Sequence, residues 1–335
     1  MTTVATVSEP ARSTSPGALA LRRLRRDREA LAFGVLLALV VVPLFAAPLY
    51  ASHVAGTTPQ ENHLTDELVI DAKRMYVVSL DGVPIGPTWR RAYFVGADEN
   101  GRDLMVRLLY GGRSSLLMGA GALGLTVLFA VPLALIAGYF RGRTDSVISR
   151  LLDLVWSFPA LLVGFLLASA INLAGARIGP LTIEPGSKLI PVTVIGLVYV
   201  PYIARPLRGQ VLALREQRFI EAARACGLGP VRVMASEMLP HLWTTILVLV
   251  PLLFSNAVVL ESALSFLGAG VQSPEPSFGT LIAAGLNNVV LSPHLLLVPS
   301  IALVLLVLSL SGLAEGLRRA LNPHGTPAVH LGRGQ

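Results

Sequence analysis

The chain has 335 residues, of which 53% are hydrophobic and only 14% are charged. A soluble domain carries about 25% charged residues, so roughly half of the charge that a water-soluble surface needs is missing. The formal net charge of +7 does not indicate a nucleic-acid partner. The basic residues stand in short segments between apolar runs, as the positive-inside rule predicts for a membrane protein in contact with lipid.

Residues 1–29 predict a cytoplasmic tail that ends in a basic cluster at 22–28, and the uncharged run 30–50 predicts the first transmembrane helix. A basic stretch before an apolar stretch is also typical of a signal peptide, but this apolar run is too long for one and further spans follow. If the first helix starts in the cytoplasm, segment 51–112 is expected to be extracytoplasmic. Within it, the pattern around the turn Asp81-Gly82 predicts a small β-hairpin formed by 75–80 and 83–85.

The part of the chain from 113 to 317 is expected to form a core with five more transmembrane helices. About 20 residues are needed to cross the hydrocarbon core of a bilayer. The stretch 189–204 is short for this, so we expect its helix to run on past Arg205 with a kink at Pro201 or Pro206. The uncharged stretches that predict these spans are 114–140, 154–176, 189–204, 238–260 and 295–314.

Arginine and lysine set the orientation of the spans. Segment 205–240 is rich in arginine and is predicted to be cytoplasmic, whereas 265–294 has neither lysine nor arginine and is predicted to lie outside. The outer segment is expected to hold a short helix around 281–286. Both termini, including the C-terminal tail 318–335, are therefore expected in the cytoplasm.

The cytoplasmic segment 205–240 has a helical pattern. Leu212, Phe219, Ala223 and Cys226 recur at helical spacing, which predicts one buried face. Gly227 is a typical helix stop, and a second short helix is expected over 231–238. Two helices that break at a glycine form either a rigid knob for a cytoplasmic partner or a solvated connection, and the pattern alone favours the solvated connection.

Several segments resemble the permease subunits of bacterial ABC importers. Glu221, Ala222, Ala223 and Gly227, followed by Leu239-Pro240, are similar to the EAA loop of that family, although Glu237 stands where isoleucine is usual. Other segments resemble the dipeptide, oligopeptide and nickel branch of the family: 96–103, 107–113, 137–140, 150–159, 261–268, 276–279 and 317–323.

This resemblance implies an all-α membrane protein with the type I ABC importer transmembrane domain, about six transmembrane helices and an extracytoplasmic insertion after the first. It implies that the chain forms half of a pathway for peptides or similar solutes in the bacterial inner membrane. The implied partners are a homologous second permease, two ATP-binding subunits and an extracytoplasmic substrate-binding protein. The chain itself is expected to be no enzyme and to bind no cofactor, with ATP and Mg²⁺ held by the ATP-binding subunits.

The absence of other motifs agrees with a transport subunit. The sequence has no GxxxxGK[ST] loop for nucleotide phosphates and no HExxH zinc motif. Asn256 and Glu261 lie in or beside a predicted span and are candidate pore or gate residues, since polar groups in membrane segments are often functional. For Glu261 a position in contact with interfacial water is an equal alternative. A self-contained secondary transporter or channel is the competing class, and it would need charged residues deep in the spans or an internal repeat.

Overall fold

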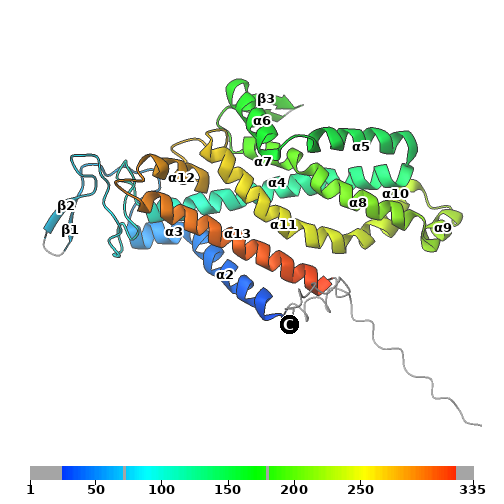
Figure 1. The fold of residues 1–335 in the computed structure, drawn as a ribbon, viewed down its shortest axis with the longest axis horizontal. Helices are drawn as coiled ribbons and strands as arrows, with labels where there is room; N and C mark the ends of the chain where they lie inside the picture. Colours follow the sequence, from blue (N-terminus) through cyan, green and yellow to red (C-terminus); the bar gives the residue numbers. More distant parts are fainter. Residues whose placement is uncertain (1–24, 71–72, 179–180, 322–335) are drawn as a thin grey trace, which may run out of the picture.

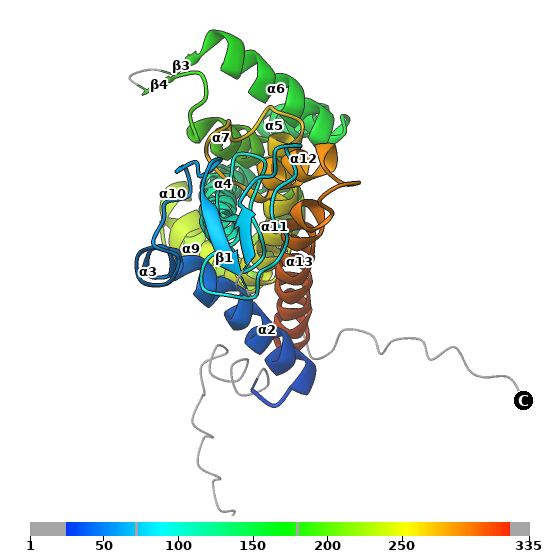
Figure 2. The ribbon, with the colours of Figure 1, turned by 90° about the vertical axis from the view of Figure 1, so that its left-hand side faces the viewer.

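The computed structural model describes residues 25–70, 73–178 and 181–321. Most of the predicted N-terminal tail and nearly all of the C-terminal tail therefore lie outside the described residues. The described chain is a bundle of long helices that run side by side along the long axis, with a small β-hairpin at one end and a short helix, α9, at the other (Figure 1). Viewed from the hairpin end, α6 projects from one side of the bundle (Figure 2).

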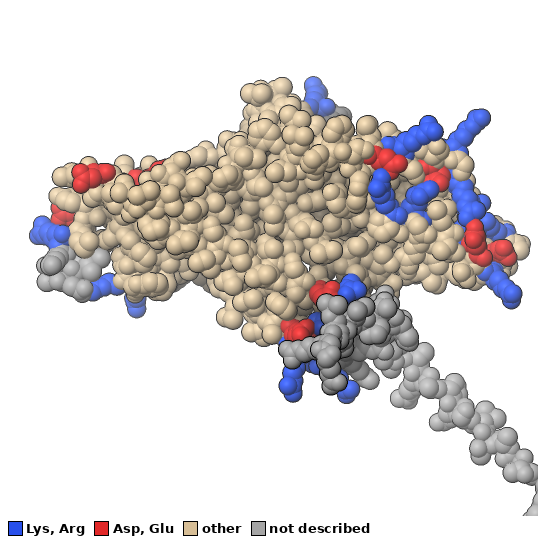
Figure 3. All heavy atoms as spheres, viewed as in Figure 1, with Lys and Arg blue, Asp and Glu red and all other residues tan. Residues whose placement is uncertain are grey.

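Charged side chains gather at the ends of the molecule. Lys, Arg, Asp and Glu cluster near the hairpin, around α9 and near the start of α2, and the broad surface between these groups is almost free of them (Figure 3). Many large apolar side chains on this surface are exposed, for example Leu39, Leu128 and Leu166. An uncharged apolar band between charged ends is what a bilayer requires of a spanning protein.

Helix α2 (Arg28–Phe45) is the first span, and it is shorter than the predicted 30–50. Asp27 caps it by accepting hydrogen bonds from the backbone N–H groups of Glu29 and Ala30 at 3.0 and 3.2 Å. The chain then leaves helical geometry at Ala46 and continues as α3 (Ala47–Tyr50) and a π-helical turn, η1 (Ala51–Ala55). Residues 47–50 of the predicted span thus belong to a separate short helix.

The first and last spans are joined along their length. Helix α13 (His294–Leu321) packs on α2, where Gly312 leaves room for the ring of Phe33. Near one end of the pair, Arg319 forms ion pairs with Asp27 at 3.4 Å and with Glu29 at 2.9 Å. The start of α2 and the end of α13 therefore lie at the same end of the pair.

The segment after η1 holds a hairpin, but its strands differ from the prediction. Strands β1 (Glu67–Ile70) and β2 (Lys73–Tyr76) pair antiparallel. At the predicted Asp81-Gly82 turn the chain does reverse, with Ser79 N–H donating to the Val83 carbonyl at 2.9 Å, yet only an isolated bridge joins Val78 to Pro84. Pro84 cannot donate a ladder hydrogen bond, which explains why regular pairing does not extend there.

Helix α4 (Leu104–Phe140) is the central span and contacts α7, α8 and α11. It begins ten residues before the predicted start at 114, because the buried side chain of Asp103 caps it by accepting from the N–H groups of Met105 and Val106 at 2.8 and 3.1 Å. Its Thr126 hydroxyl donates to the Gly196 carbonyl at 2.9 Å, which ties α4 to α7.

The predicted third span at 154–176 forms a helix only from Ala160, after a break at 157–159. The chain forms α5 (Gly142–Trp156) and α6 (Ala160–Ala174), which are bent by 88° at the break between them. Pro159 disfavours a helical backbone at the preceding Phe158, which accounts for the break. Strands β3 (Ala176–Ile178) and β4 (Leu181–Ile183) follow. By length and composition, the described residues hold five membrane-spanning helices, or six if α5 and α6 form one bent span.

The expected extension of the short span is confirmed. Helices α7 (Leu189–Val198) and α8 (Val200–Arg215) continue through a break at Tyr199, just before Pro201. Helix α9 (Arg218–Ala225), the short α10 (Pro230–Arg232) and the π-helical turn η2 (Val233–Met238) lead into α11 (Leu239–Phe266). The expected outer helix is α12 (Phe278–Asn287), which Ser277 and Thr280 cap reciprocally.

Gly312→Ala is expected to lower the free energy of unfolding by about 1–3 kcal/mol, because its new Cβ would overlap the ring of Phe33 and overpack the α2–α13 contact. Thermal unfolding of the detergent-purified protein measures this. Gly34→Ala is the matched control on α2, since no described atom outside the adjoining backbone lies within 4 Å of its Cβ position. Equal effects of the two substitutions would contradict the proposed packing.

Candidate functional site: the α9 knob and the buried polar groups

Helix α9 projects at one end of the bundle (Figure 1). It ends in a Schellman motif: Gly227, in the left-handed region with φ +81°, donates its N–H to the Arg224 carbonyl at 2.9 Å, and Leu228 donates to the Ala223 carbonyl at 3.2 Å. The predicted helix stop at Gly227 is therefore confirmed. Glycine suits this position because residues with a Cβ are strained there.

One apolar side chain fixes α9 to the bundle. Ile220 is fully buried in the core cluster that α4, α8, η2 and α11 share, which includes Leu207, Val211 and Leu242. Burial of an isoleucine side chain contributes about 1.5–3 kcal/mol. A movement of α9 must therefore carry these helices with it, or pull Ile220 out of the core.

Two ring contacts add to this attachment. The Phe219 ring stacks on the ring of His241 in α11, with 5.0 Å between the ring centroids. The Arg224 guanidinium lies over the ring of Tyr139 near the end of α4, 4.7 Å from its centroid. Helix α9 thus touches two spans that are far apart in sequence.

The predicted buried face of this segment is wrong in part. Phe219 and Cys226 are exposed, whereas Ile220 is buried. The helical register breaks between Arg215 and Arg218, so Leu212 belongs to α8 and does not share a face with residues of α9. A pattern fitted across the break assigned the wrong phase, and Ile220 was missed.

The residues of the EAA-like motif fall into two groups. Glu221, Ala222 and Gly227 are exposed on α9 and just after it, and no described ion pair involves Glu221. Ala223 and Leu239 are partly buried against the core cluster of Ile220. Pro240 lies in the first turn of α11. The motif therefore combines an exposed surface with the contacts that hold it in place.

Ion pairs surround the same end of the bundle. Arg208 on α8 contacts both carboxylate oxygens of Asp145 on α5, one of them at 2.6 Å. Arg205 and Asp153 form a second pair between these helices, and Arg141 with Glu216 forms a third close to α9. These pairs connect α5 and the residue before it, Arg141, to α8 and the residue after it, Glu216.

The two candidate pore or gate residues differ in environment. Glu261 is fully buried in α11, where Ser265 Oγ donates to its Oε1 at 2.7 Å and its Oε2 has no hydrogen-bond partner among the described residues. The alternative prediction that Glu261 contacts interfacial water is therefore wrong, because the side chain is fully buried. Asn256 is exposed on the same helix. The hydroxyl of Ser265 also accepts from the N–H of Val271 at 3.0 Å, so Glu261 helps to fix the chain that leads to α12.

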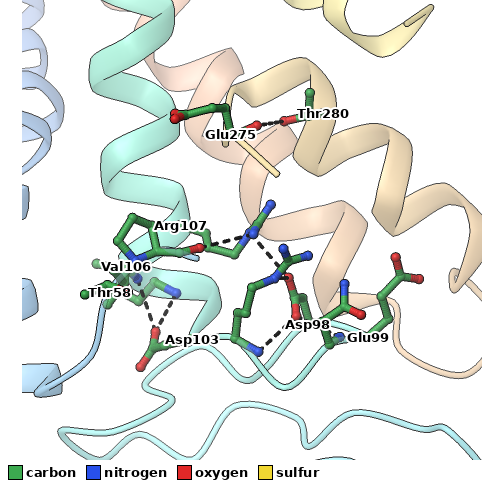
Figure 4. Close-up of polar contacts among 12 residues, drawn as sticks. Thr58, Asp98, Glu99, Asp103, Val106, Arg107, Glu275 and Thr280 are labelled. Carbon is green, nitrogen blue, oxygen red and sulfur yellow. Dashed lines mark hydrogen bonds and ion pairs between the residues drawn. The ribbon is translucent and has the colours of Figure 1, made fainter. Parts of the chain in front are cut away.

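A buried ionic cluster lies at the opposite end from α9, where the chain enters α4 (Figure 4). Asp98 binds Arg102 Nε at 2.7 Å and lies 3.3 Å from Arg107 Nε, and all three side chains are less than 10% exposed. Arg107 also donates to the Pro59 carbonyl at 3.2 Å. Nearby, burial raises the pKa of the Tyr93 hydroxyl to about 12, helped by the charge of the neighbouring Asp66. The cluster ties the loop 98–102 and the segment around Pro59 to Arg107 in the first turn of α4.

Asp98→Ala is expected to lower the free energy of unfolding by about 3–5 kcal/mol, because it leaves two buried arginines without their shared carboxylate. Glu67→Ala is the matched control, since the Glu67–Arg74 pair is solvent-exposed and is worth at most about 1 kcal/mol. Thermal unfolding in detergent compares the two. A loss of similar size in both variants would argue against the buried cluster.

Glu261→Ala is expected to cost about 3 kcal/mol of stability, because it leaves a cavity and removes the acceptor of Ser265. Asn256→Ala, at an exposed position of the same helix, should change stability by less than about 0.5 kcal/mol. The unfolding midpoints of the two purified variants test this difference. An unperturbed midpoint for Glu261→Ala would show that its side chain is not packed as described.

Comparison with known proteins identifies the family of this chain. Residues 130–324 match the family described as binding-protein-dependent transport system inner membrane component. The chain is 30% identical to the dipeptide transport system permease protein DppC of Alkalihalophilus pseudofirmus over 312 residues, 93% of this chain and 91% of that protein. It is 32% identical to the oligopeptide transport system permease protein OppC of Haemophilus influenzae over 304 residues, 91% and 87% of the two chains.

A solved structure supports the fold. An inward-facing form of the MetNI methionine ABC transporter has a chain that is similar with a TM-score of 0.52 at 17% identity, covering 65% of this chain and 97% of that one. The helical architecture of a type I ABC importer permease is thus shared. The chain belongs to the family of inner-membrane permease components of binding-protein-dependent ABC importers.

Proposed function

We propose that this chain carries peptides across the bacterial inner membrane as one of two homologous permeases, and that α9 is the element that receives force from an ATP-binding subunit. Relatives that share most of the chain are permeases of dipeptide and oligopeptide transport systems, which supports peptides as the solute class. An extracytoplasmic binding protein would deliver the solute. The N- and C-termini would lie in the cytoplasm with α9.

The observation that carries this proposal is the attachment of α9. Its outer surface presents Glu221, Ala222 and Gly227 to solvent, while Ile220 holds its inner side in the core. A partner that binds the outer surface can therefore move α4, α8 and α11 as a unit, in the manner of rigid-body switching. Two ATP-binding subunits, with ATP and Mg²⁺, would supply this movement.

The competing class, a self-contained secondary transporter or channel, has less support. On the face drawn in Figure 3, the surface between the charged ends is almost free of Lys, Arg, Asp and Glu. Proton- or ion-coupled transporters place ionisable groups near the middle of the membrane. Glu261 is the clear exception, and its hydrogen bond to Ser265 gives it a structural role.

Gly227→Val is expected to reduce ATP-dependent peptide uptake about fivefold or more, because a side chain strains the left-handed backbone that ends α9. The measurement is uptake by membrane vesicles that contain the whole importer. The amount of permease in the membrane should stay unchanged, since no atom lies within 4 Å of the new Cβ.

Gly229→Val is the matched control. Gly229 lies two residues further on, has an ordinary negative φ of −68° and also has open space around its Cβ position. We expect uptake close to that of the wild type. Equal uptake by the Gly227 and Gly229 variants would contradict a role for the shape of α9 in coupling.

A further inference from the structure

A cavity of about 560 Å³ opens at the end of the bundle opposite α9. Helix α4, the start of α7 and the segment before α12 form its walls. Its lining is polar at Gln60, Tyr110, Arg113, Lys188 and Glu275 and apolar at Leu117, Met118 and Val192. This size lies within the range of pockets that bind small ligands, about 300–1,000 Å³.

Helix α4 lines the cavity with a continuous face. Tyr110, Arg113 and Leu117 follow each other at intervals of three and four residues, so their side chains lie above one another on the helix. Because α4 begins at Leu104, Arg113 stands about 14 Å along the helix from its first residue. The sequence stretch 114–140 placed Arg113 outside the helix, and for this reason its position inside a spanning helix was missed.

The charges in the cavity do not cancel. Lys188 Nζ and Glu275 Oε2 form an ion pair at 2.9 Å, and Gln60 Nε2 donates to Glu275 Oε1 at 3.2 Å. Figure 4 shows Glu275 beside α4, on the segment that leads to α12. Arg113 makes no ion pair with any described residue, and its guanidinium lies 5.9 Å from the centroid of the Phe45 ring. One positive charge is thus left without a carboxylate.

We propose that this cavity binds the C-terminal carboxylate of a short peptide at the entrance of the translocation path, with Arg113 as the carboxylate ligand. The inference rests on the proposed function and names a site for its solute. A guanidinium fork matches a carboxylate and binds it through two parallel hydrogen bonds. The apolar part of the lining suits the side chains of a peptide, and Glu275 can bind its amino group in exchange for Lys188.

An anionic lipid headgroup is the other source of a negative charge near the outer end of a span. The mixed lining favours the peptide, because the ammonium group of a peptide can replace Lys188 as the partner of Glu275, whereas a phosphate has no group that can pair with this carboxylate. The experiment below therefore compares vesicles of anionic and of neutral lipid.

The test uses the whole importer in proteoliposomes with its own binding protein. The probes are a tripeptide with a free C-terminal carboxylate and the same tripeptide as its C-terminal amide. The preference for the free carboxylate is measured as the ratio of the two uptake rates. Because the binding protein is the same throughout, its own preference cancels when permease variants are compared.

Arg113→Gln is expected to lower this preference about tenfold or more, since a hydrogen bond to a charged group is lost, with uptake of the amide nearly unchanged. Arg113→Lys keeps the charge without the fork and should lower the preference by a smaller factor. Arg91→Gln is the matched control, because Arg91 is an exposed arginine in the segment before α4 and its loss should leave the preference as it is.

An unchanged preference in both Arg113 variants, with normal wild-type uptake, would overturn the site and leave the proposed function intact. An effect of Arg113→Gln seen in anionic vesicles and absent in neutral ones would assign Arg113 to lipid and also overturn it. Failure of the wild-type importer to take up either peptide with ATP would instead overturn the proposed function.

Discussion

The burial of Ile220 in the core is the contact on which the coupling account depends. Helix α9 has only eight residues, and a helix of that length is not stable in water by itself. Its shape comes from the Schellman motif at Gly227, and its position comes from Ile220, together with the ring contacts of Phe219 and Arg224. A short helix held in this way acts as part of the bundle, whereas a flexible loop would absorb the displacement of a partner.

The rest of the fold is suited to pass a displacement of α9 along the bundle. Helix α4 extends over 37 residues and connects the two ends of the molecule. One end contacts α9 through Tyr139, and the other is fixed by Asp98, Arg102 and Arg107. Along its length α4 packs on α7, α8 and α11. On the proposed function, a displacement at α9 would reach the cavity beside Arg113 through one continuous helix and the helices packed on it.

Much of this architecture could be predicted from the sequence, because a bilayer imposes a simple rule on apolar run length. The approximate positions of most spans, the extension past Arg205, the stop at Gly227 and the short helix α12 all follow from apolar runs, prolines and glycines. The starts of helices were less accurate. Uncharged runs mark the part of a helix that crosses hydrocarbon, and α4 continues beyond that part through Arg113 to its cap at Asp103.

Two other features depend on tertiary contacts and could not be read from local pattern. Pro159 indicates a break between α5 and α6 but not their 88° angle, and the burial of Ile220 depends on a register break at the end of α8. The most direct test of the central claim is the number of peptides transported per ATP hydrolysed by a reconstituted importer that carries Ile220→Ala. We predict that this ratio falls while the ATP-binding subunits stay bound and hydrolyse ATP. An unchanged ratio would show that force does not pass through the attachment of α9.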